Sequence, residues 1–306
     1  MPEGKHIPVL LEETLSLLDP ERGGSFLDCT FGGGGHSRAI LSRAGKNSLL
    51  VALDRDPAAT ARAEALSEDF RDSFVFHGMN FSRLDGLSEA PFDGILMDLG
   101  VSSFQLDDAS RGFSFRDDAP TDMRMDTSAG ISAAEFLETA PRDRIEEAVR
   151  DFGEEPRWRR VVDAIFDARG TGALASTASF AELVDRAVGR RPGAKIRPAT
   201  KTFQGVRIAV NDELGELRRA LPKAFAALKP RGVLAVISFH SLEDRIVKRF
   251  FKEMCGRPVD RRDNRLQDER KQFAELLTGK ALRPSADEIS RNPRSRSSRL
   301  RAIRKL

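Results

Sequence analysis

The 306-residue sequence predicts an α/β fold, a mostly parallel sheet with helices on both faces, together with an inserted all-helical domain. Three observations lead to this prediction. Short apolar runs alternate with amphipathic segments in the first hundred residues and again near the end, a pattern typical of β-α-β units. No strand-like run stands out between residues 106 and 199. Hydrophobic residues make up 40% of the chain and charged residues 32%, which provides for buried cores and a wet surface.

The predicted strands are short apolar runs that end in polar residues or glycines. They cover residues 26–30, 48–54, 73–77, 92–99 and 233–239, and two more are expected at 280–283 and 298–304. The helices between them cover residues 36–43, 57–70, 212–228 and 241–254. Pro57 suits a first helical turn. Pro230–Gly232 ends the helix before it, and Ser241 followed by Asp244 suits an N-cap.

Glycine and proline separate short amphipathic segments after the fourth strand. The predicted helices there are 133–139, 142–151, 158–169 and 180–188. We therefore divide the chain into a first α/β part over residues 1–105, an inserted helical domain over 106–199, and a second α/β part over 200–306 that ends in a basic tail.

Composition excludes several classes of protein. No apolar run approaches the roughly 20 residues that span a bilayer. The N-terminus carries Glu3, Glu12 and Glu13 and has no apolar core, so we expect no signal peptide. Two cysteines, Cys29 and Cys255, without a CxxC pair, exclude a disulfide scaffold and a zinc finger. These features predict a cytoplasmic protein with no membrane partner and no metal.

Charge is unevenly distributed along the chain. The net charge is +3, yet residues 290–306 hold seven lysines and arginines and no acid. The tail is therefore +7 and the first 289 residues sum to −4. A tail of one sign favours contact with a polyanion, and a solvated terminus remains the alternative.

A glycine-rich loop follows the first predicted strand. Gly32–Gly35 come after Asp28 and open a helix, which lets the backbone approach a ligand closely. The spacing does not fit GxGxxG, and GxxxxGK[ST] is absent, so nicotinamide cofactors and nucleoside triphosphates are disfavoured. Asp54 ends the second strand, 20 residues after Gly34, where a carboxylate can accept ribose hydroxyls. Together these residues resemble the cofactor site of methyltransferases that use S-adenosyl-L-methionine (SAM).

Asp98 ends the fourth predicted strand, in the string Asp98-Leu99-Gly100-Val101-Ser102-Ser103. Ligands of open parallel sheets bind outside the carboxyl ends of the strands, so Asp98 is expected to face the same crevice as Gly34 and Asp54. Amino-methyltransferases carry an Asp/Asn-Pro-Pro-aromatic motif at this position. The proline pair and the aromatic residue are missing here, which leaves the group that stacks on the acceptor unassigned.

Eight longer strings make the resemblance specific, and they span nearly the whole chain. They are His6–Glu13, Asp28–Ser37, Leu53–Pro57, Asp93–Phe115, Asp122–Asp126, Ala199–Leu214, Ser238–Phe251 and Asn292–Arg301. In these strings the chain resembles the bacterial 16S rRNA cytosine-N4 methyltransferases, the RsmH or MraW family. Long runs in the family's order are far more specific than any short motif.

The resemblance implies a Rossmann-like SAM-dependent methyltransferase fold in which the inserted domain helps to recognise substrate. It implies methylation of the exocyclic N4 of a cytidine in the decoding region of 16S rRNA, in the small (30S) ribosomal subunit, with S-adenosyl-L-homocysteine as the other product. The SAM contacts that it implies are Gly34, Gly35, His36, Asp54, Phe81, Asp98 and Gln105. One extra residue precedes Phe81 relative to the family pattern, which weakens that assignment.

Candidate catalytic and RNA-binding residues follow from the chemistry. Asp98, or a carbonyl of Leu99–Val101, would accept an N4 hydrogen, and His240 would either relay a proton or fix a loop. A flipped base needs an aromatic platform, for which Phe104, Phe113 and Phe115 are candidates, although packing is the alternative for them. Candidate phosphate contacts, each equally well a solvated charge, are Arg111, Arg116, Arg124, Lys195, Arg197, Lys201 and the C-terminal arginines.

Two other functions remain open at the level of sequence. One is a non-catalytic ribosome-assembly factor that binds SAM or RNA without turnover. The other is a methyltransferase that acts on another acceptor, a small molecule or a protein. The sequence leaves the oligomeric state open between monomer and homodimer.

Overall fold

The structure is a computed structural model that describes residues 8–45, 47–189, 197–260 and 262–306. The chain forms two compact units. Unit 1 comprises Met1–Gly100 and Leu214–Leu306, and unit 2 comprises Val101–Glu213. The sequence placed the helical insertion at 106–199, whereas unit 2 extends through the whole of helix α9, Ala199–Asn211.

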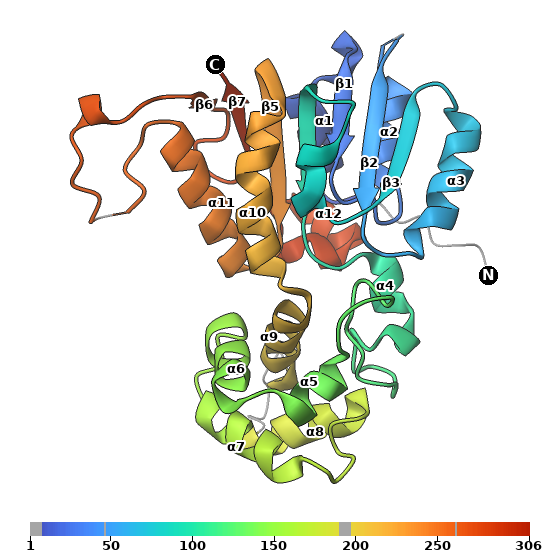
Figure 1. Cartoon of the computed structure of the whole chain (residues 1–306), viewed down its shortest axis with the longest axis vertical. Helices are drawn as coiled ribbons and strands as arrows, with labels where there is room; N and C mark the ends of the chain where they lie inside the picture. The colour runs from blue at the N-terminus through green and yellow to red at the C-terminus, as the bar shows by residue number, and fades with distance from the viewer. Residues whose placement is uncertain (1–7, 46, 190–196, 261) are drawn as a thin grey trace. The chain divides into compact units, whose positions relative to one another are not determined.

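Unit 1 is built on a seven-stranded sheet with the order β3-β2-β1-β4-β5-β7-β6 (Figure 1). Its strands are β1 Ser25–Asp28, β2 Leu49–Asp54, β3 Phe74–Gly78, β4 Phe92–Asp98, β5 Leu228–Ser238, β6 Ala274–Leu276 and β7 Arg299–Lys305. Strands β1 to β5 pair in parallel, while β7 runs antiparallel to both β5 and β6. The strand order reverses between β1 and β4, which is where open parallel sheets bind ligands. The predicted α/β fold class is confirmed.

Helices cover both faces of this sheet because each central strand is apolar on both sides. The helices are α1 Leu11–Leu18, α2 Gly35–Arg43, α3 Ala59–Asp69, α10 Glu213–Ala226, α11 Ser241–Met254 and α12 Ala286–Arg291. Phe26, Leu50 and Leu96 share one core with α1, α2 and α3. Leu27 and Val51, the next residues along their strands, share the other core with α10 and α11. Alternation with a period of two thus assigns each strand residue to one of two layers.

Several predicted boundaries in unit 1 were wrong. The segment Pro230–Gly232 lies inside β5, where a register shift lets Leu228 pair with Phe92 and Val233 pair with Gly94. The strand predicted at 280–283 is only an isolated bridge at Leu282, and β6 lies at 274–276 instead. The C-terminal residues are not a free tail, because β7 is an internal strand of the sheet.

Unit 2 is helical, as predicted. Its α-helices are α4 Ser103–Asp107, α5 Ala133–Thr139, α6 Arg142–Glu146, α7 Trp158–Ala168, α8 Thr177–Val188 and α9, and a π-helix, η4, covers Glu147–Phe152. The sequence did not predict α9 as a helix of its own. A Cβ at Gly205 of α9 would lie 2.0 Å from the carbonyl oxygen of Ala148, so glycine is what allows α9 and η4 to pack this closely.

Short 3₁₀ helices complete the chain. They are η1 Pro20–Arg22, η2 Phe81–Gly86, η3 Ala109–Arg111, η5 Gln267–Glu269 and η6 Pro293–Ser297. Within the part of the chain that the structure describes, no helix combines the length and the apolar character needed to cross a membrane.

Candidate functional site

The carboxyl ends of three neighbouring strands each carry an aspartate. Asp28 ends β1, Asp54 ends β2 and Asp98 ends β4. Because β2, β1 and β4 are adjacent and parallel, these residues share one edge of the sheet. The glycine loop after β1 lies at the same edge, so unit 1 gathers the residues that the sequence predicted to meet there.

Gly34 shapes the start of α2. Its φ of 74° is left-handed, and an added Cβ would lie 2.8 Å from the ring of Phe31. Gly34 is the N-cap of α2 and provides no side-chain cap for the helix. The amide N–H groups of the first turn, at Gly35 and His36, therefore point toward the end of the helix, where an anionic ligand group can accept them.

Asp54 orders the glycine loop from the neighbouring strand. Its Oδ2 accepts a hydrogen bond of 2.7 Å from the amide of Gly32, and its Oδ1 accepts one of 2.8 Å from the amide of Asp56. Burial raises the pKa of Asp54 above its ordinary value. Each carboxylate oxygen has a second lone pair, so the side chain can still accept a ligand hydroxyl.

Asp28 is the most deeply buried of the three carboxylates. Its Oδ2 accepts a hydrogen bond of 2.6 Å from Ser37 Oγ, and its Oδ1 accepts one of 3.1 Å from the amide of Thr30. Burial raises its pKa to about 6, even though these hydrogen bonds oppose the rise. Asp28 thus ties the first turn of α2 to the end of β1.

Asp98 presents an acceptor that the protein leaves unused. Its Oδ1 is buried and has no hydrogen-bond partner among the described residues. Its Oδ2 lies 3.6 Å from Nε2 of His36. Burial raises the pKa of Asp98 well above its usual range, and the carboxyl groups of Asp28 and Glu243 add to the rise. A buried acceptor without a partner is costly, and it favours a ligand that donates a hydrogen bond or carries positive charge.

The other predicted cofactor residues lie in different places. Phe81 begins η2, just beyond the end of β3, and is partly buried against the core of unit 1. It therefore extends the same sheet edge past Asp54. Gln105 belongs to unit 2, where its Oε1 accepts a hydrogen bond of 2.9 Å from the amide of Ser102 in the capping box of α4. A cofactor contact by Gln105 stays a prediction.

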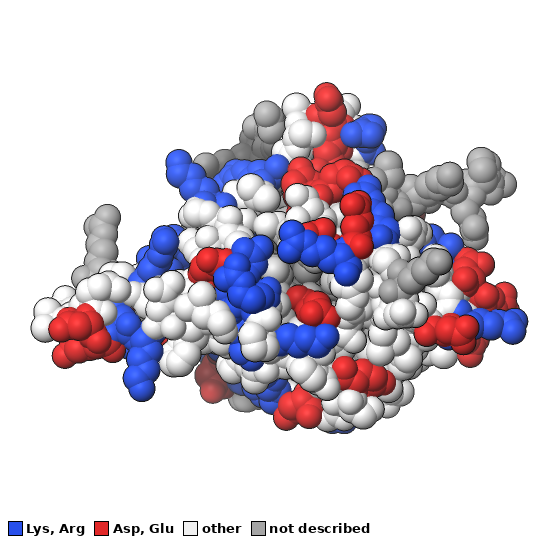
Figure 2. Space-filling view, turned by 90° about the horizontal axis from the view of Figure 1, so that it is seen from above, with Lys and Arg blue, Asp and Glu red and all other residues white. Residues whose placement is uncertain are grey.

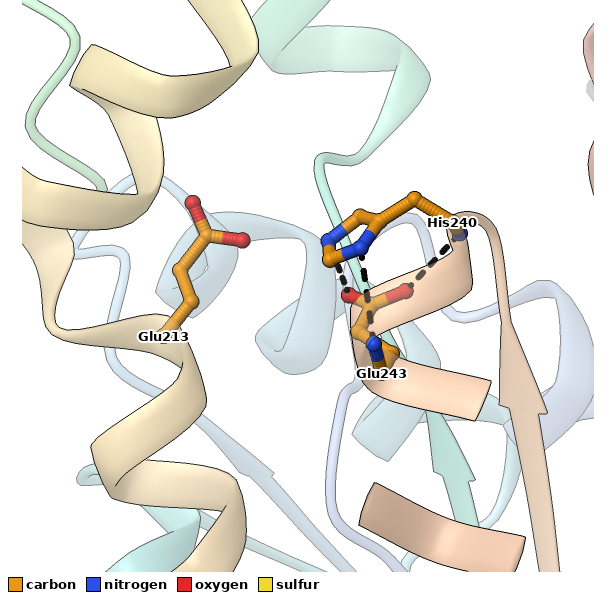
Figure 3. Close-up of side chains that lie close together, drawn as sticks. All are labelled: Glu213, His240 and Glu243. Carbon is orange, nitrogen blue, oxygen red and sulfur yellow. Dashed lines mark hydrogen bonds and ion pairs between the residues drawn. The ribbon is translucent and has the colours of Figure 1, made fainter. Parts of the chain in front are cut away.

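His240 is the N-cap of α11, a position that the sequence assigned wrongly to Ser241. Figure 3 shows its ring beside the carboxylate of Glu243. The amide of Glu243 donates to Nδ1 of His240 at 3.4 Å, and Oε2 of Glu243 accepts from the amides of Phe239 at 2.8 Å and His240 at 3.2 Å. This reciprocal capping box gives His240 a structural role, which it would keep even if it also relayed a proton.

The candidate RNA contacts of unit 2 are mostly engaged within it. Arg124 forms a two-pronged ion pair with Asp122, and Nε and Nη2 of Arg197 both donate to Oδ2 of Asp185. Lys201 donates to the carbonyl of Glu154, and Arg111 donates to two main-chain carbonyls. Arg116 is exposed, and Lys195 lies outside the described residues.

The candidate stacking residues differ in exposure. Phe113 is buried in the core of unit 2, and Phe115 makes an edge-to-face contact with Phe203 at 4.8 Å between ring centroids. Phe104 is 44% exposed. Packing therefore accounts for Phe113 and Phe115, which leaves Phe104 as the stacking candidate.

Three of the C-terminal arginines form ion pairs within unit 1. Asp244 of α11 accepts hydrogen bonds from Arg299 at 2.8 Å and Arg301 at 2.7 Å. Arg304 pairs with Glu275 on β6 at 2.8 Å. The polyanion contact predicted from the tail therefore loses three of its seven cations to internal ion pairs.

Three residues with a clear part in the site were missed at the sequence level. Thr30 accepts a hydrogen bond from the amide of Asp98, Ser37 donates to Asp28, and Glu243 caps α11. Only Glu243 left a local signal, because it stands three residues after His240 at the spacing of a capping box. The other two partners depend on how strands and helices come together.

A known family, several sequences and several structures are similar to this chain. The model of the MraW methylase family matches residues 3–306. The chain is 47% identical over 306 residues to the ribosomal RNA small subunit methyltransferase H of Rickettsia akari, with 98% of each chain covered. It is 47% identical over 304 residues to the protein of the same name from Rickettsia canadensis, covering 98% of this chain and 97% of the relative. Among solved structures, it aligns with an rRNA methylase from Streptococcus thermophilus at a TM-score of 0.44 and 10% identity, with 99% of each chain covered.

Proposed function

The chain belongs to the MraW methylase family, and on that premise we propose that it transfers a methyl group from SAM to ribosomal RNA of the small subunit. Relatives that match over almost their full length carry that activity in their name. The observation that carries the proposal is the convergence of Gly34, Asp54 and Asp98 on one edge of the sheet.

The residues at this edge fit the cofactor. The open first turn of α2 suits a carboxylate, and Asp54 suits ribose hydroxyls. Phe81, beyond the end of β3, offers an aromatic face for a purine ring. The partnerless Oδ1 of Asp98 and the buried Asp28 place negative potential where a cationic ligand would be stabilised. His36, Gly35 and Gln105 complete the proposed cofactor set.

We propose the exocyclic N4 of a cytidine in the decoding region of 16S rRNA, presented by the small (30S) subunit, as the acceptor. When bound, SAM supplies a methyl group that its sulfonium has already activated, so no metal is needed. The N4 lone pair is delocalised into the cytosine ring. An acceptor for an N4 hydrogen favours pyramidal nitrogen and so restores the lone pair for attack.

Asp98 is the residue that we assign to this task. Its Oδ1 is buried, lacks a partner among the described residues and belongs to a carboxyl group with a raised pKa. A carboxylate with a raised pKa is a stronger base, and it holds a proton better at the moment the amine loses it. One N4 hydrogen is accepted by Asp98, and its proton passes to Asp98 as the new nitrogen–carbon bond forms.

Two alternative functions differ from this proposal, one in the absence of methyl transfer and the other in the molecule that accepts the methyl group. An assembly factor would bind RNA or SAM without transferring methyl groups. A methyltransferase of another acceptor would label a protein or a small molecule. An RNA substrate within the ribosome places the proposed activity in the cytoplasm.

The test is tritium transfer from labelled SAM to small subunits purified from a strain that lacks the enzyme. Naked 16S rRNA and wild-type subunits serve as comparison substrates, and nucleoside mass spectrometry locates the methyl group. We expect label on N4 of one cytidine in the deficient subunits and none on wild-type subunits. Measurable SAM binding without label on any RNA would overturn the proposal.

A further inference from the structure

The positive charge of this chain resides in its last 93 residues, which include strands β5, β6 and β7. Residues 214–306 hold 24 lysines and arginines against 11 aspartates and glutamates, a net charge of +13. The first 213 residues are −10 by the same count. Unit 2, residues 101–213, holds 17 basic and 20 acidic residues and is therefore −3. A polyanion would be attracted to the C-terminal part of unit 1 rather than to the helical unit.

Many of these cations are used inside unit 1. Besides the arginines of β7, Lys229 pairs with Asp93 and Lys223 pairs with Asp85. In the view of Figure 2, lysine and arginine side chains accordingly lie among aspartate and glutamate side chains. A binding surface must therefore be sought where cations gather without carboxylates.

Helix α11 carries a set of cations with few carboxylates beside them on its solvent side. Val247 and Phe251 face the core, and Glu243 and Asp244 are buried by their capping and arginine contacts. The exposed or partly exposed basic residues are Arg245, Lys248, Arg249 and Lys252. At about 100° per residue these four lie within an arc of roughly 100°. These cations thus form a basic stripe over two turns of the helix, and the exposed Glu253 lies next to it.

The turn after α11 extends the stripe. The amide of Arg257 donates to the carbonyl of Lys252 at 2.8 Å, and Gly256 lies between them at a φ of 63°. This helix-ending turn keeps the exposed Arg257 at the last turn of α11. Lys248, Lys252 and Arg257 have no ion-pair partner among the described residues.

An aromatic residue lies at the C-terminal end of α11. The amide of Phe273 donates to the carbonyl of Met254 at 2.8 Å, so residues 271–273 run along the end of α11. Phe273 is 49% exposed and Lys271 is exposed. We call Lys248, Arg249, Lys252, Arg257, Lys271 and Phe273 the α11 patch. Two carboxylates border it, Asp260 at 3.5 Å from Arg249 and the exposed Glu253.

We propose that the α11 patch binds a single-stranded RNA segment, with cations on its phosphates and a base stacked on Phe273. The inference rests on the proposed function, whose substrate is RNA. Lys248, Lys252 and Arg257, which have no ion-pair partner among the described residues, suit a phosphodiester backbone. The exposed ring of Phe273 at the end of the same helix suits an unpaired base. Helix α11 starts at the carboxyl end of β5, and the patch begins at Lys248, about 10 Å along the helix, and continues to its far end, about 20 Å from the start. It is a second RNA contact outside the methyl-transfer site.

The test compares two triple variants with the same net charge. One is Lys248→Gln, Arg249→Gln and Lys252→Gln in the α11 patch. The other is Arg22→Gln, Arg43→Gln and Arg71→Gln, three exposed cations of the N-terminal half. Fluorescence anisotropy with a labelled 12-nucleotide oligouridylate measures affinity across a salt series. We expect the patch variant to bind about tenfold more weakly, with a salt slope shallower by about 2, and the comparison variant to bind as the parent does.

Further readouts separate this inference from the proposed function. Phe273→Ala is expected to weaken the oligouridylate and to spare the same RNA annealed to oligoadenylate, because a duplex offers no free base. Weaker RNA binding in the patch variants with unchanged SAM affinity supports the patch, whether or not methyl transfer is detected. Equal loss in both triple variants, or unchanged RNA affinity in the patch variant, overturns it and leaves the methylation proposal standing. Weaker binding to intact subunits alone would also overturn it, and would assign the surface to a ribosomal protein.

Discussion

Thr30 Oγ1 accepts a hydrogen bond of 2.7 Å from the backbone amide of Asp98. The two residues are 68 positions apart and stand just beyond β1 and at the end of β4, on either side of the reversal in strand order. The bond joins the loop that begins the cofactor edge to the carboxylate proposed to contact the acceptor.

Thr30→Val is expected to lower the free energy of unfolding and to weaken SAM binding. Valine keeps the shape of threonine but leaves the partly buried amide of Asp98 without its acceptor, which costs about 1–3 kcal/mol. Urea denaturation and calorimetric titration with SAM measure the two effects. Thr30→Ser keeps the hydroxyl and should retain most of the unfolding free energy and of the SAM affinity. Equal losses of these two quantities in the valine and serine variants would contradict the role of the hydroxyl.

Asp28→Asn is expected to remove a pH dependence from stability. The folded pKa of Asp28 is about 6 and its ordinary value is 3.8, so between these values the native state binds more protons than the unfolded state. Stability of the parent therefore falls as pH rises through this window, by at most about 3 kcal/mol. The difference in unfolding free energy between variant and parent, measured from pH 4 to 7 without SAM, should change across the window. Parallel curves would show that Asp28 titrates normally.

Asp98→Asn is expected to slow the chemical step. If Asp98 takes the N4 proton, single-turnover methyl transfer at saturating SAM should fall by about 10²- to 10⁴-fold. The parent rate should rise with pH through a pKa raised above the ordinary aspartate value, and this rise should vanish in the variant. A variant with weaker SAM affinity but the parent rate at saturation would restrict Asp98 to holding the cofactor.

His240→Asn and His240→Ala separate capping from proton transfer. Asparagine is a good N-cap, whereas alanine leaves the first turn of α11 uncapped and should cost about 1 kcal/mol in unfolding free energy. We expect the asparagine variant to keep methyl transfer within a few fold of the parent, with the same pH profile. Loss of transfer in a stably folded asparagine variant would instead make His240 a proton relay.

Asp244→Asn is expected to destabilise unit 1 by about 2–3 kcal/mol, because Arg299 and Arg301 would lose their carboxylate in a partly buried position. Burial opposes its ionisation, yet Arg301 and Arg299 hold the pKa of Asp244 below its ordinary value. The contribution is therefore present above about pH 4 and is lost as pH falls through the lower folded pKa. Thermal denaturation at pH 7 and pH 3 checks this, since the gap between variant and parent should narrow in acid.

Much of this architecture was readable along the chain. The strands that end at Asp28, Asp54 and Asp98 follow from apolar runs, and the helices after them follow from amphipathic spacing, because both patterns lie within a few neighbouring residues. Four consecutive glycines and a carboxylate 20 residues after Gly34 were enough to predict a cofactor edge. The long strings shared with the family specified the activity more narrowly than any local pattern could.

Tertiary structure alone decided which side chains already form ion pairs or hydrogen bonds within the protein. Seven cations at the C-terminus look the same in sequence, yet Arg299 and Arg301 meet Asp244 because β7 inserts between β5 and β6. Lys248 and Lys252 of α11, which have no ion-pair partner among the described residues, stand out only once these pairs are known. Thr30 reaches the amide of Asp98, and His240 rather than Ser241 caps α11, through strand pairing and main-chain geometry. Sequence patterns report the local preferences of a segment, whereas a hydrogen bond or an ion pair depends on which distant groups the packed fold places within reach.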